Sequence, residues 1–216
     1  MGVWRGVGVL MMSVMGTGLA QETDAIKLPP PEMAGGMPLM QALKARHSTR
    51  AFSSKPLPPQ VLSNLLWAAS GVNRPDTGQR TAPSAHDWRE IDVYAATAEG
   101  AFRYDPASHT LIRVATGDIR HLTGVQDYVA TAPLNLVYVA NLKRMSEAGA
   151  EDKAFYSATD TGFVAQNVYL YCASAGLAVV VRGLIDRDAL GAALGLGSHQ
   201  KIILAQSVGY PDGSAK

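Results

Sequence analysis

Two arginines and two hydroxyl side chains stand within five consecutive residues, Arg46-His47-Ser48-Thr49-Arg50. This 46–50 cluster follows a predicted helix at 37–45, and the run that ends at Pro56 cannot continue that helix, because proline disfavours helical geometry before itself. Alternate side chains of an extended chain share a face, which groups Arg46 with Ser48 and Arg50, and His47 with Thr49. Two guanidinium groups on one face can bind a phosphate; the alternative is a solvent-exposed basic turn.

Three other kinds of chemistry are not supported by the spacing of the residues that they need. The histidines are scattered and Cys172 is the sole cysteine, so no metal site is predicted. Gly191, Gly195 and Gly197 follow a predicted helix instead of opening one after a strand, which argues against a dinucleotide fingerprint or a phosphate-binding loop. Ser48 and Ser84 lack the surroundings of a nucleophile elbow, so a hydrolase triad is weakly supported.

Three later stretches recur in a familiar order after the cluster: Ala82-Pro83-Ser84-Ala85, a helix at 162–176, and the segment from Gly176-Leu177 through Gly183 to Val208-Gly209-Tyr210-Pro211. Together with the cluster they cover nearly all of 39–211. This ordered set resembles the nitroreductase-like family of flavin oxidoreductases, whose chains carry an early R-x-S-x-R/K motif for FMN. We therefore expect 39–216 to be an FMN-binding oxidoreductase domain.

The resemblance implies which residues contact the flavin. The first motif, Arg46, His47, Ser48 and Arg50, would hold the phosphate and the pyrimidine edge, and Pro83, Ser84 and Ala85 would lie along the ring from the partner subunit. Arg182 and Gly183 match the position whose backbone N–H faces N5, and the Arg182 side chain is expected either to be an exposed charge or to guide an anionic substrate. Because hydride transfer depends on positioning, no side chain is assigned as a general acid.

Two positions depart from the family pattern. Where many members have an asparagine that reads N3–H and O4, this chain has Asp87, a carboxylate that accepts from N3–H but repels O4. The alternative is that Asp87 points away and pairs with a cation such as Arg89. After Tyr210-Pro211, only Lys216 could add a basic group for the phosphate, so phosphate binding is expected to depend on the first cluster.

The elements that must position these residues can be read from periodicity and turn signals. Helices are predicted at 37–45, 59–69, 156–175 and 186–194, with a further one starting at Gly117-Asp118 and running toward Tyr128. Strands are predicted at 91–95, 101–104, 110–115, 134–140, 178–181 and 201–208, and 71–80 is a polar loop. The run 134–140 is apolar throughout and marks the sheet centre. The alternation predicts an α+β fold with a mixed sheet sandwiched by helices.

The long helix at 156–175 carries apolar residues on more than one side, which predicts burial on several faces. In a domain of this size, that burial needs a central position or a second subunit. The family resemblance likewise implies an intertwined homodimer. Cys172 falls inside this helix and is expected to be buried and structural.

The whole chain has 216 residues, of which 47% are hydrophobic and 17% charged, with a formal net charge of +1. These values suit one globular domain. A net charge near zero offers no strong field for nucleic acid or anionic lipid. The expected partners are a small-molecule substrate and a second copy of the chain.

Residues 1–20 differ from the rest of the sequence. Arg5 precedes an apolar run at 7–15, and small residues lead to Ala20. This order predicts a secretory signal peptide cleaved after Ala20, and the run is too short for a membrane span. The mature protein would be periplasmic or secreted, without stable membrane insertion, and 21–38 would form a linker or a surface arm.

The leading hypothesis is an FMN-dependent oxidoreductase that passes hydride through flavin N5 between a small organic donor and acceptor, as a nitroreductase or as a dehydrogenase. The Trp67-Ala68-Ala69 pattern with Gly71 and the short length favour the branch that resembles azoline oxidases. The alternative is a flavin-binding electron-transfer protein or a structural dimer without a substrate of its own.

Overall fold

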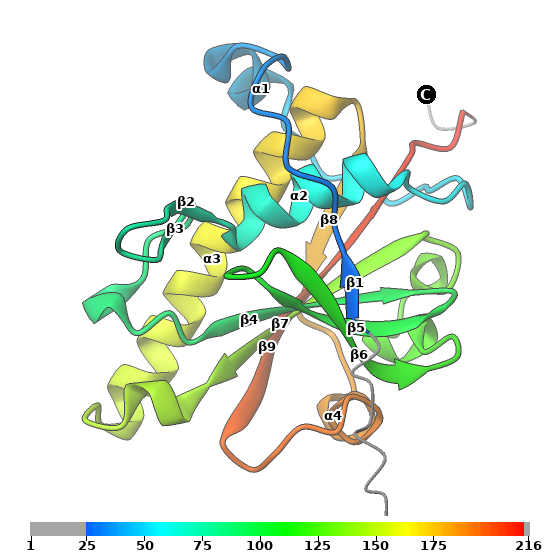
Figure 1. Cartoon of the computed structure of the whole chain (residues 1–216). Coiled ribbons are helices and arrows are strands. Elements are labelled where there is room, and N and C mark those ends of the chain that lie inside the picture. The colour runs from blue at the N-terminus through cyan, green and yellow to red at the C-terminus, as the bar shows by residue number, and fades with distance from the viewer. Residues whose placement is uncertain (1–24, 214–216) are drawn as a thin grey trace, which may run out of the picture.

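The computed structural model describes residues 25–213, so the expected signal peptide, the start of the expected arm and Lys216 lie outside the described residues. One sheet of seven strands runs through the molecule in the order β1-β6-β5-β4-β7-β9-β8, and β2 and β3 form a separate hairpin (Figure 1). The strands are β1 (Ala25–Lys27), β2 (Val72–Arg74), β3 (Gln79–Arg80), β4 (Ile91–Thr97), β5 (Gly100–Asp105), β6 (Thr110–Thr116), β7 (Leu134–Asn141), β8 (Ala178–Arg182) and β9 (Gln200–Gly209). The helices are α1 (Leu39–Ala45), α2 (Pro59–Ser70), α3 (Ala150–Ala175) and α4 (Arg187–Ala193).

Every strand pair in the described part of the sheet is antiparallel. The α+β class is confirmed, whereas the expectation of a mixed sheet is not met within 25–213. The expected hairpin at 101–104 and 110–115 is confirmed as β5 and β6. The apolar β7 lies inside the sheet between β4 and β9, although the middle strand is β4. β4 is buried on both faces, which explains why its alternation in sequence is weak.

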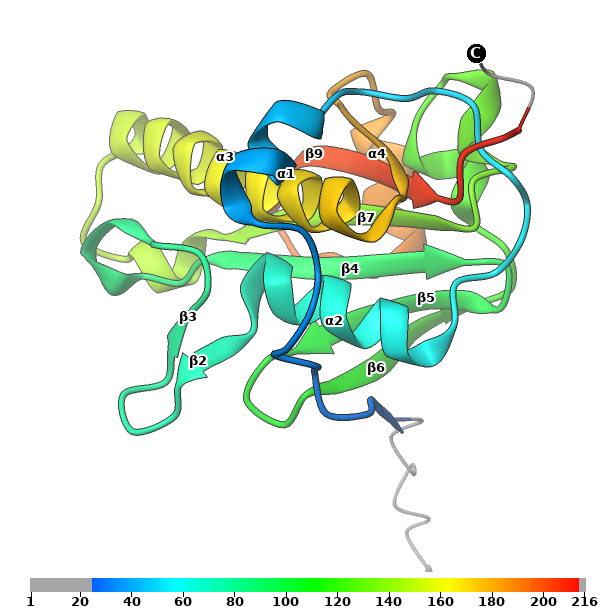
Figure 2. The same cartoon turned by 90° about the horizontal axis from the view of Figure 1, so that it is seen from above.

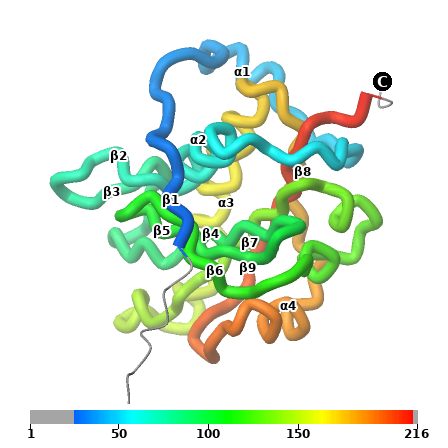
Figure 3. Tube along the Cα trace, turned by 45° about the vertical axis from the view of Figure 1, so that its right-hand side comes forward, coloured from blue at the N-terminus to red at the C-terminus, as the bar shows by residue number. Residues whose placement is uncertain are grey.

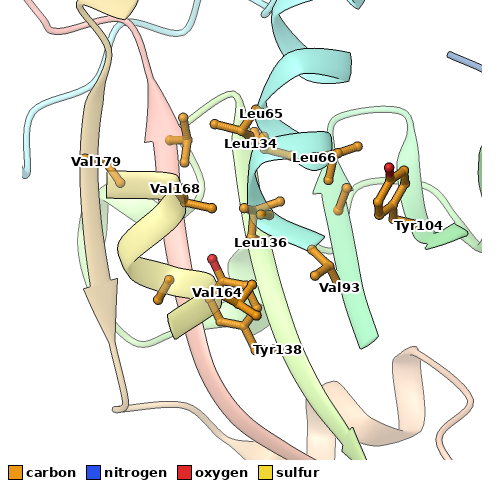
Figure 4. Close-up of a cluster of buried hydrophobic side chains, with 14 of the residues drawn as sticks. Leu65, Leu66, Val93, Tyr104, Leu134, Leu136, Tyr138, Val164, Val168 and Val179 are labelled. Atoms are coloured by element: carbon orange, nitrogen blue, oxygen red, sulfur yellow. The ribbon is translucent and has the colours of Figure 1, made fainter. Parts of the chain in front are cut away.

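Helices cover the two faces of the sheet unequally. α1, α2 and α3 lie on one face, with α2 and α3 side by side, and α4 lies alone on the other face (Figures 1 and 2). The face under α2 and α3 holds the larger core, which joins Leu65 and Leu66 of α2, Val164 and Val168 of α3, and Leu136 of β7 (Figure 4). Burying each such side chain contributes about 1.5–3 kcal/mol.

The helix boundaries follow local signals. α2 begins at the second of two prolines, where a missing N–H costs nothing. α3 is longer than predicted and ends where Gly176 adopts φ 67°, the left-handed conformation that suits glycine. α4 is capped by the Asp186 carboxylate, which accepts from the Ala189 N–H at 3.0 Å.

Two expectations about local structure were wrong. The helix expected from Gly117-Asp118 is absent, and 117–128 contains 3₁₀ turns instead. The Asp118 carboxylate accepts the Arg120 backbone N–H and pairs with the Arg120 guanidinium, but the turn that follows ends at Gly124, whose φ of 173° and ψ of 170° are extended. The loop at 71–80 contains the β2–β3 hairpin, which projects from the edge of the molecule (Figure 3). Within the expected linker or surface arm, β1 is exposed and pairs with β6 at the edge of the sheet.

Candidate functional site

The 46–50 cluster is organised by one tyrosine of α3. The hydroxyls of Ser48 and Tyr169 are hydrogen-bonded at 2.9 Å, and the Arg46 guanidinium lies 5.3 Å from the centre of the Tyr169 ring. The same phenol oxygen accepts the Val181 N–H at 2.9 Å, and the Thr49 N–H donates to the Val179 carbonyl at 2.9 Å. Tyr169 therefore joins the cluster to the end of β8, next to Arg182 and Gly183.

The cationic groups of the cluster are available to a ligand. Neither the Arg46 nor the Arg50 side chain forms an ion pair or a hydrogen bond with another residue in the described range, and Arg50 is exposed. His47 and Thr49 instead line a cavity of about 180 Å³ with Cys172. His47 and Thr49 therefore lie apart from the two arginines, as expected for alternate side chains of an extended segment. Burial raises the pKa of the Cys172 thiol, and its expected buried position is confirmed.

The loop formed by Pro83, Ser84 and Ala85, here the 83–85 loop, is held by two buried carboxyl groups. The Ala85 N–H donates to Asp160 Oδ2 at 2.9 Å, and the Ser84 hydroxyl donates to Glu90 Oε2 at 3.2 Å. Ser84 Oγ also accepts the Arg89 N–H at 2.8 Å. These bonds fix the loop against the N-terminal half of α3.

The two groups of predicted flavin contacts are separated within one chain. The 83–85 loop is attached at Asp160 and the 46–50 cluster at Tyr169, nine residues further along α3. At 1.5 Å of rise per residue, this corresponds to roughly 13 Å along the helix axis. The separation fits the implication that the two groups contact a flavin from different subunits, which stays a prediction.

Glu90 is the most enclosed acid of this region. It is fully buried, its Oε2 is bound by Ser84, and its Oε1 has no partner in the described protein. Burial raises the pKa of Glu90 above its ordinary value. The neighbouring Asp160 carboxyl adds to the shift, whereas hydrogen bonds from the Glu90 backbone and the Ser84 hydroxyl oppose it. A protonated Glu90 would have a hydrogen to donate from its unpartnered oxygen.

Asp87 follows the second of its two expected alternatives. Its carboxylate forms an ion pair with the Arg89 guanidinium, in which Arg89 Nε donates to Asp87 Oδ1 at 2.6 Å. This bond lowers the pKa of Asp87. The side chain of Asp87 is 54% exposed, and whether it faces a bound flavin stays a prediction.

Both roles expected for the Arg182 side chain are corrected. Arg182 is only 7% exposed, and its guanidinium donates to the Thr123 carbonyl and hydroxyl, to Asn135 Oδ1 and to Ser207 Oγ. Burial lowers the pKa of Arg182 to about 10. The side chain is therefore part of the interior, while the following Gly183 is exposed and can present its backbone.

Sequence reasoning missed Tyr169, Glu90 and Asp160. Each lies in a segment that was predicted correctly or adjoins one. Tyr169 falls within the matched helix at 162–176, but no role was assigned to it, and Glu90 and Asp160 belong to no motif. A signal was present for Asp160 alone, as a charged residue inside a helix that is otherwise largely apolar. Within residues 25–213 no cluster of His, Cys, Asp or Glu could hold a metal ion, and no helix is long and apolar enough to cross a membrane.

The model of the nitroreductase family matches residues 43–210. A protein of Methanocaldococcus jannaschii that is provisionally named a nitroreductase is 32% identical over 172 residues, which cover 75% of this chain and 85% of that protein. This chain therefore belongs to the nitroreductase family, a family of oxidoreductases that generally use a flavin. The resemblance found in the sequence is confirmed.

Solved structures agree with this assignment. A crystal structure of a provisionally named nitroreductase from Ralstonia eutropha has a TM-score of 0.84 and 46% identity, covering 96% of this chain and 97% of that one. An NADPH:FMN oxidoreductase from Vibrio harveyi, complexed with NAD⁺, has a TM-score of 0.62 and 19% identity, covering 82% of this chain and 70% of that one. The second likeness shows the shared fold alone.

Proposed function

We propose that this chain is an FMN-dependent oxidoreductase that passes hydride between a small organic donor and a small organic acceptor. The observation that carries the proposal is the arrangement at Tyr169. There, Arg46 and Ser48 meet the ring and hydroxyl of one side chain, whose oxygen also holds the Val181 N–H close to Gly183. Bound FMN would supply a ring that accepts and releases hydride at N5.

The residues at this place fit such a cofactor. Arg46 and Arg50 have no anionic partner among the described residues, so both guanidinium groups can bind a phosphate through charge-assisted hydrogen bonds. The Ser48 hydroxyl is fixed by Tyr169 and supplies a short polar contact. Gly183 is exposed at the end of β8, so its backbone N–H is not shielded by a side chain.

The test is the absorption spectrum of purified protein that begins at Gln21, together with the flavin content of Arg46→Ala. We expect flavin absorbance in the wild type, and FMN affinity weaker by about 1.5–3 kcal/mol in the variant, because one charge-assisted contact is lost. Lys44→Ala, which removes an exposed charge from the last turn of α1, is the matched control and should keep its flavin. Colourless wild type, or full flavin load in Arg46→Ala, would count against the proposal.

We also propose that the protein works as a homodimer in which each 83–85 loop serves the flavin of its partner. Apolar side chains remain exposed on α3 and on the neighbouring α1: Phe155 at 61%, Phe163 at 44%, Leu39 at 63% and Met40 at 75%. Such a patch is unusual for a chain that stays alone in water. A second copy with the same apolar face would cover it.

Sedimentation of the wild type and of Phe163→Lys tests the dimer. The wild type should be dimeric at micromolar concentration, and the charged variant should dissociate and lose flavin. The control Gln166→Lys places the same charge on an exposed α3 position that is already polar. A wild-type monomer that retains its flavin would show that the dimer is not needed.

Two finer features complete the proposal. We propose export with cleavage after Ala20, which N-terminal sequencing of secreted protein would check.

We also propose a dehydrogenase of an organic substrate in preference to a nicotinamide-driven reductase, because an exported enzyme has less access to a nicotinamide donor. Rapid anaerobic bleaching of the flavin by NADH or NADPH would favour the reductase instead.

A further inference from the structure

A second polar cavity, of about 220 Å³, lies beside the 83–85 loop. The end of α2, the β2–β3 hairpin and the N-terminal half of α3 enclose it. Its polar lining comes from Ser70, Arg74, Gln79, Arg80, Ser84, Asp87, Arg89 and Asp160. Three guanidinium groups surround this small space, and none of the three arginines belongs to the motif assigned to the flavin.

Arg80 is the central cation of this cavity. Its Nη1 donates to Ser70 Oγ at 3.2 Å and to the Ile91 carbonyl at 3.3 Å, both of which are neutral acceptors. Among residues 25–213 it forms no ion pair, and its Nη2 and Nε donate to no other described residue. Burial, and next the nearby Arg144, lower the pKa of Arg80, and the Asp92 carboxylate opposes this shift.

The other charges of the lining leave a positive excess. Arg89 is engaged with Asp87, so that pair is neutral as a unit. Arg74 is anchored by its Nη2, which donates to the Arg80 carbonyl at 3.0 Å. Three arginines and two aspartates line the cavity, so the formal excess is one positive charge. Asp160 is the remaining carboxylate, and it is already bound by the Ala85 N–H. The space is therefore suited to an anion and not to a metal ion.

The rest of the wall is apolar, formed by Ala82, Pro83, Ile91 and Val164. One end of the cavity is polar and cationic, and the other is lined by aliphatic side chains. Such a cavity fits a molecule that has an anionic group at one end and an apolar body at the other. We propose that this cavity binds a small organic carboxylate, with the acid group on Arg80 and Arg74 and the apolar body against Ile91 and Val164. Placing this ligand next to a bound flavin rests on the proposed function, because Pro83 and Ser84 serve both sites.

The experiment is calorimetric titration of the purified protein with benzoate and, in parallel, with benzamide, a neutral molecule of nearly the same shape. Benzoate should bind, and benzamide should bind at least roughly tenfold more weakly, because it lacks the charge. Arg80→Met should weaken benzoate binding by roughly 10- to 100-fold and leave benzamide nearly unchanged. Lys201→Gln removes an exposed charge from β9 outside this cavity and should bind benzoate as the wild type does.

Arg80 is hydrogen-bonded to Ser70 and Ile91, so circular dichroism is used to check that Arg80→Met folds. Arg74→Gln, at an exposed position, is a second variant with less risk to the fold. Arg74→Gln should weaken benzoate binding by about 2- to 5-fold. No benzoate binding to the wild type, equal binding of benzamide, or wild-type binding in the folded arginine variants would overturn the proposal. The flavin spectrum of each sample separates the proposal of bound FMN from the proposal of a carboxylate site. Benzoate binding by a colourless protein would refute bound FMN alone. A yellow protein that does not bind benzoate would refute the carboxylate site alone.

Discussion

At Tyr169, in the C-terminal half of α3, one phenol oxygen joins Ser48 to the Val181 N–H, whereas at Asp160, in the N-terminal half, a buried carboxylate holds the Ala85 N–H. Both residues attach a loop to the same helix. At the Tyr169 end the nearby cations, Arg46 and Arg50, are left without an anion. At the Asp160 end the carboxyl groups are buried and largely bound by the chain itself.

The difference separates two uses of polar residues next to a helix. A neutral hydroxyl can position a loop without neutralising the arginines beside it, so their charge remains for a ligand. A buried carboxylate adds a stronger, charge-assisted bond to the backbone, but it must stay paired because an unpaired buried charge is costly. We therefore expect changes at the Asp160 end to affect stability first, together with the position of the 83–85 loop, and changes at the Tyr169 end to affect both stability and flavin binding.

The largest effect is expected for Asp160→Ala. This change removes the acceptor of the Ala85 N–H and should lower the free energy of unfolding by about 1–3 kcal/mol. Asp160→Asn retains an oxygen acceptor and is the matched control, with most of the stability preserved. Urea denaturation at pH 7 measures both, and equal stability of the alanine and asparagine variants would show that the bond to Ala85 contributes little.

Tyr169→Phe should have the next largest effect. It removes the hydrogen bonds to Ser48 and Val181 but keeps the ring beneath Arg46, and it should cost about 1–2 kcal/mol of unfolding free energy. The affinity for FMN should fall as well, because Ser48 is no longer fixed. Tyr171→Phe is the control, since that hydroxyl donates to the Val61 carbonyl at a long 3.4 Å and touches neither Ser48 nor Val181. A greater loss in Tyr171→Phe would contradict the role given to Tyr169.

Glu90→Gln should change how stability depends on pH. The folded pKa of Glu90 is raised above its ordinary 4.5, so above pH 4.5 there is a range in which the folded protein keeps a proton that the unfolded chain has lost. In that range the free energy of unfolding falls as the pH rises. Glutamine cannot titrate, so the variant should gain stability relative to the wild type as the pH increases through this range.

Thermal unfolding of both proteins at a series of pH values checks this expectation. Glu147→Gln, at an exposed position, serves as the control for the loss of one carboxyl group. A stability difference between Glu90→Gln and wild type that stays constant with pH would mean that Glu90 does not hold its proton in the folded state.

The smallest effect is expected for Asp87→Asn. The Asp87–Arg89 pair is largely exposed, so its loss should change the free energy of unfolding by less than about 1 kcal/mol. Because the carboxylate is paired with Arg89, the midpoint potential of bound flavin should not change. Potentiometric titration measures this midpoint potential. If it rises in Asp87→Asn by roughly 20 mV, or about 1 kcal/mol for a two-electron couple, the Asp87 charge lies next to the ring, contrary to this expectation.

Much of the fold could be read from local patterns. The hairpin of β5 and β6, the apolar β7, and the helices α2 and α4 follow from turn residues, periodicity and caps, which are properties of neighbouring residues. The helix expected from Gly117 was wrong because the turn after Asp118 ends at Gly124, where the backbone is extended. β1 was missed because this three-residue edge strand forms by pairing with β6, which is distant in sequence, and its own residues give no local signal.

The sequence by itself determined the 46–50 cluster, the 83–85 loop and the family to which they belong, because motif residues lie close together in the chain. Only the tertiary structure decided what those residues meet: Tyr169 for Ser48, Asp160 for Ala85, and a neutral interior network for Arg182. The physical reason is that a buried polar group must find a partner in three dimensions. Which partner it finds depends on how α3 packs against the sheet and the loops, and no local pattern encodes that packing.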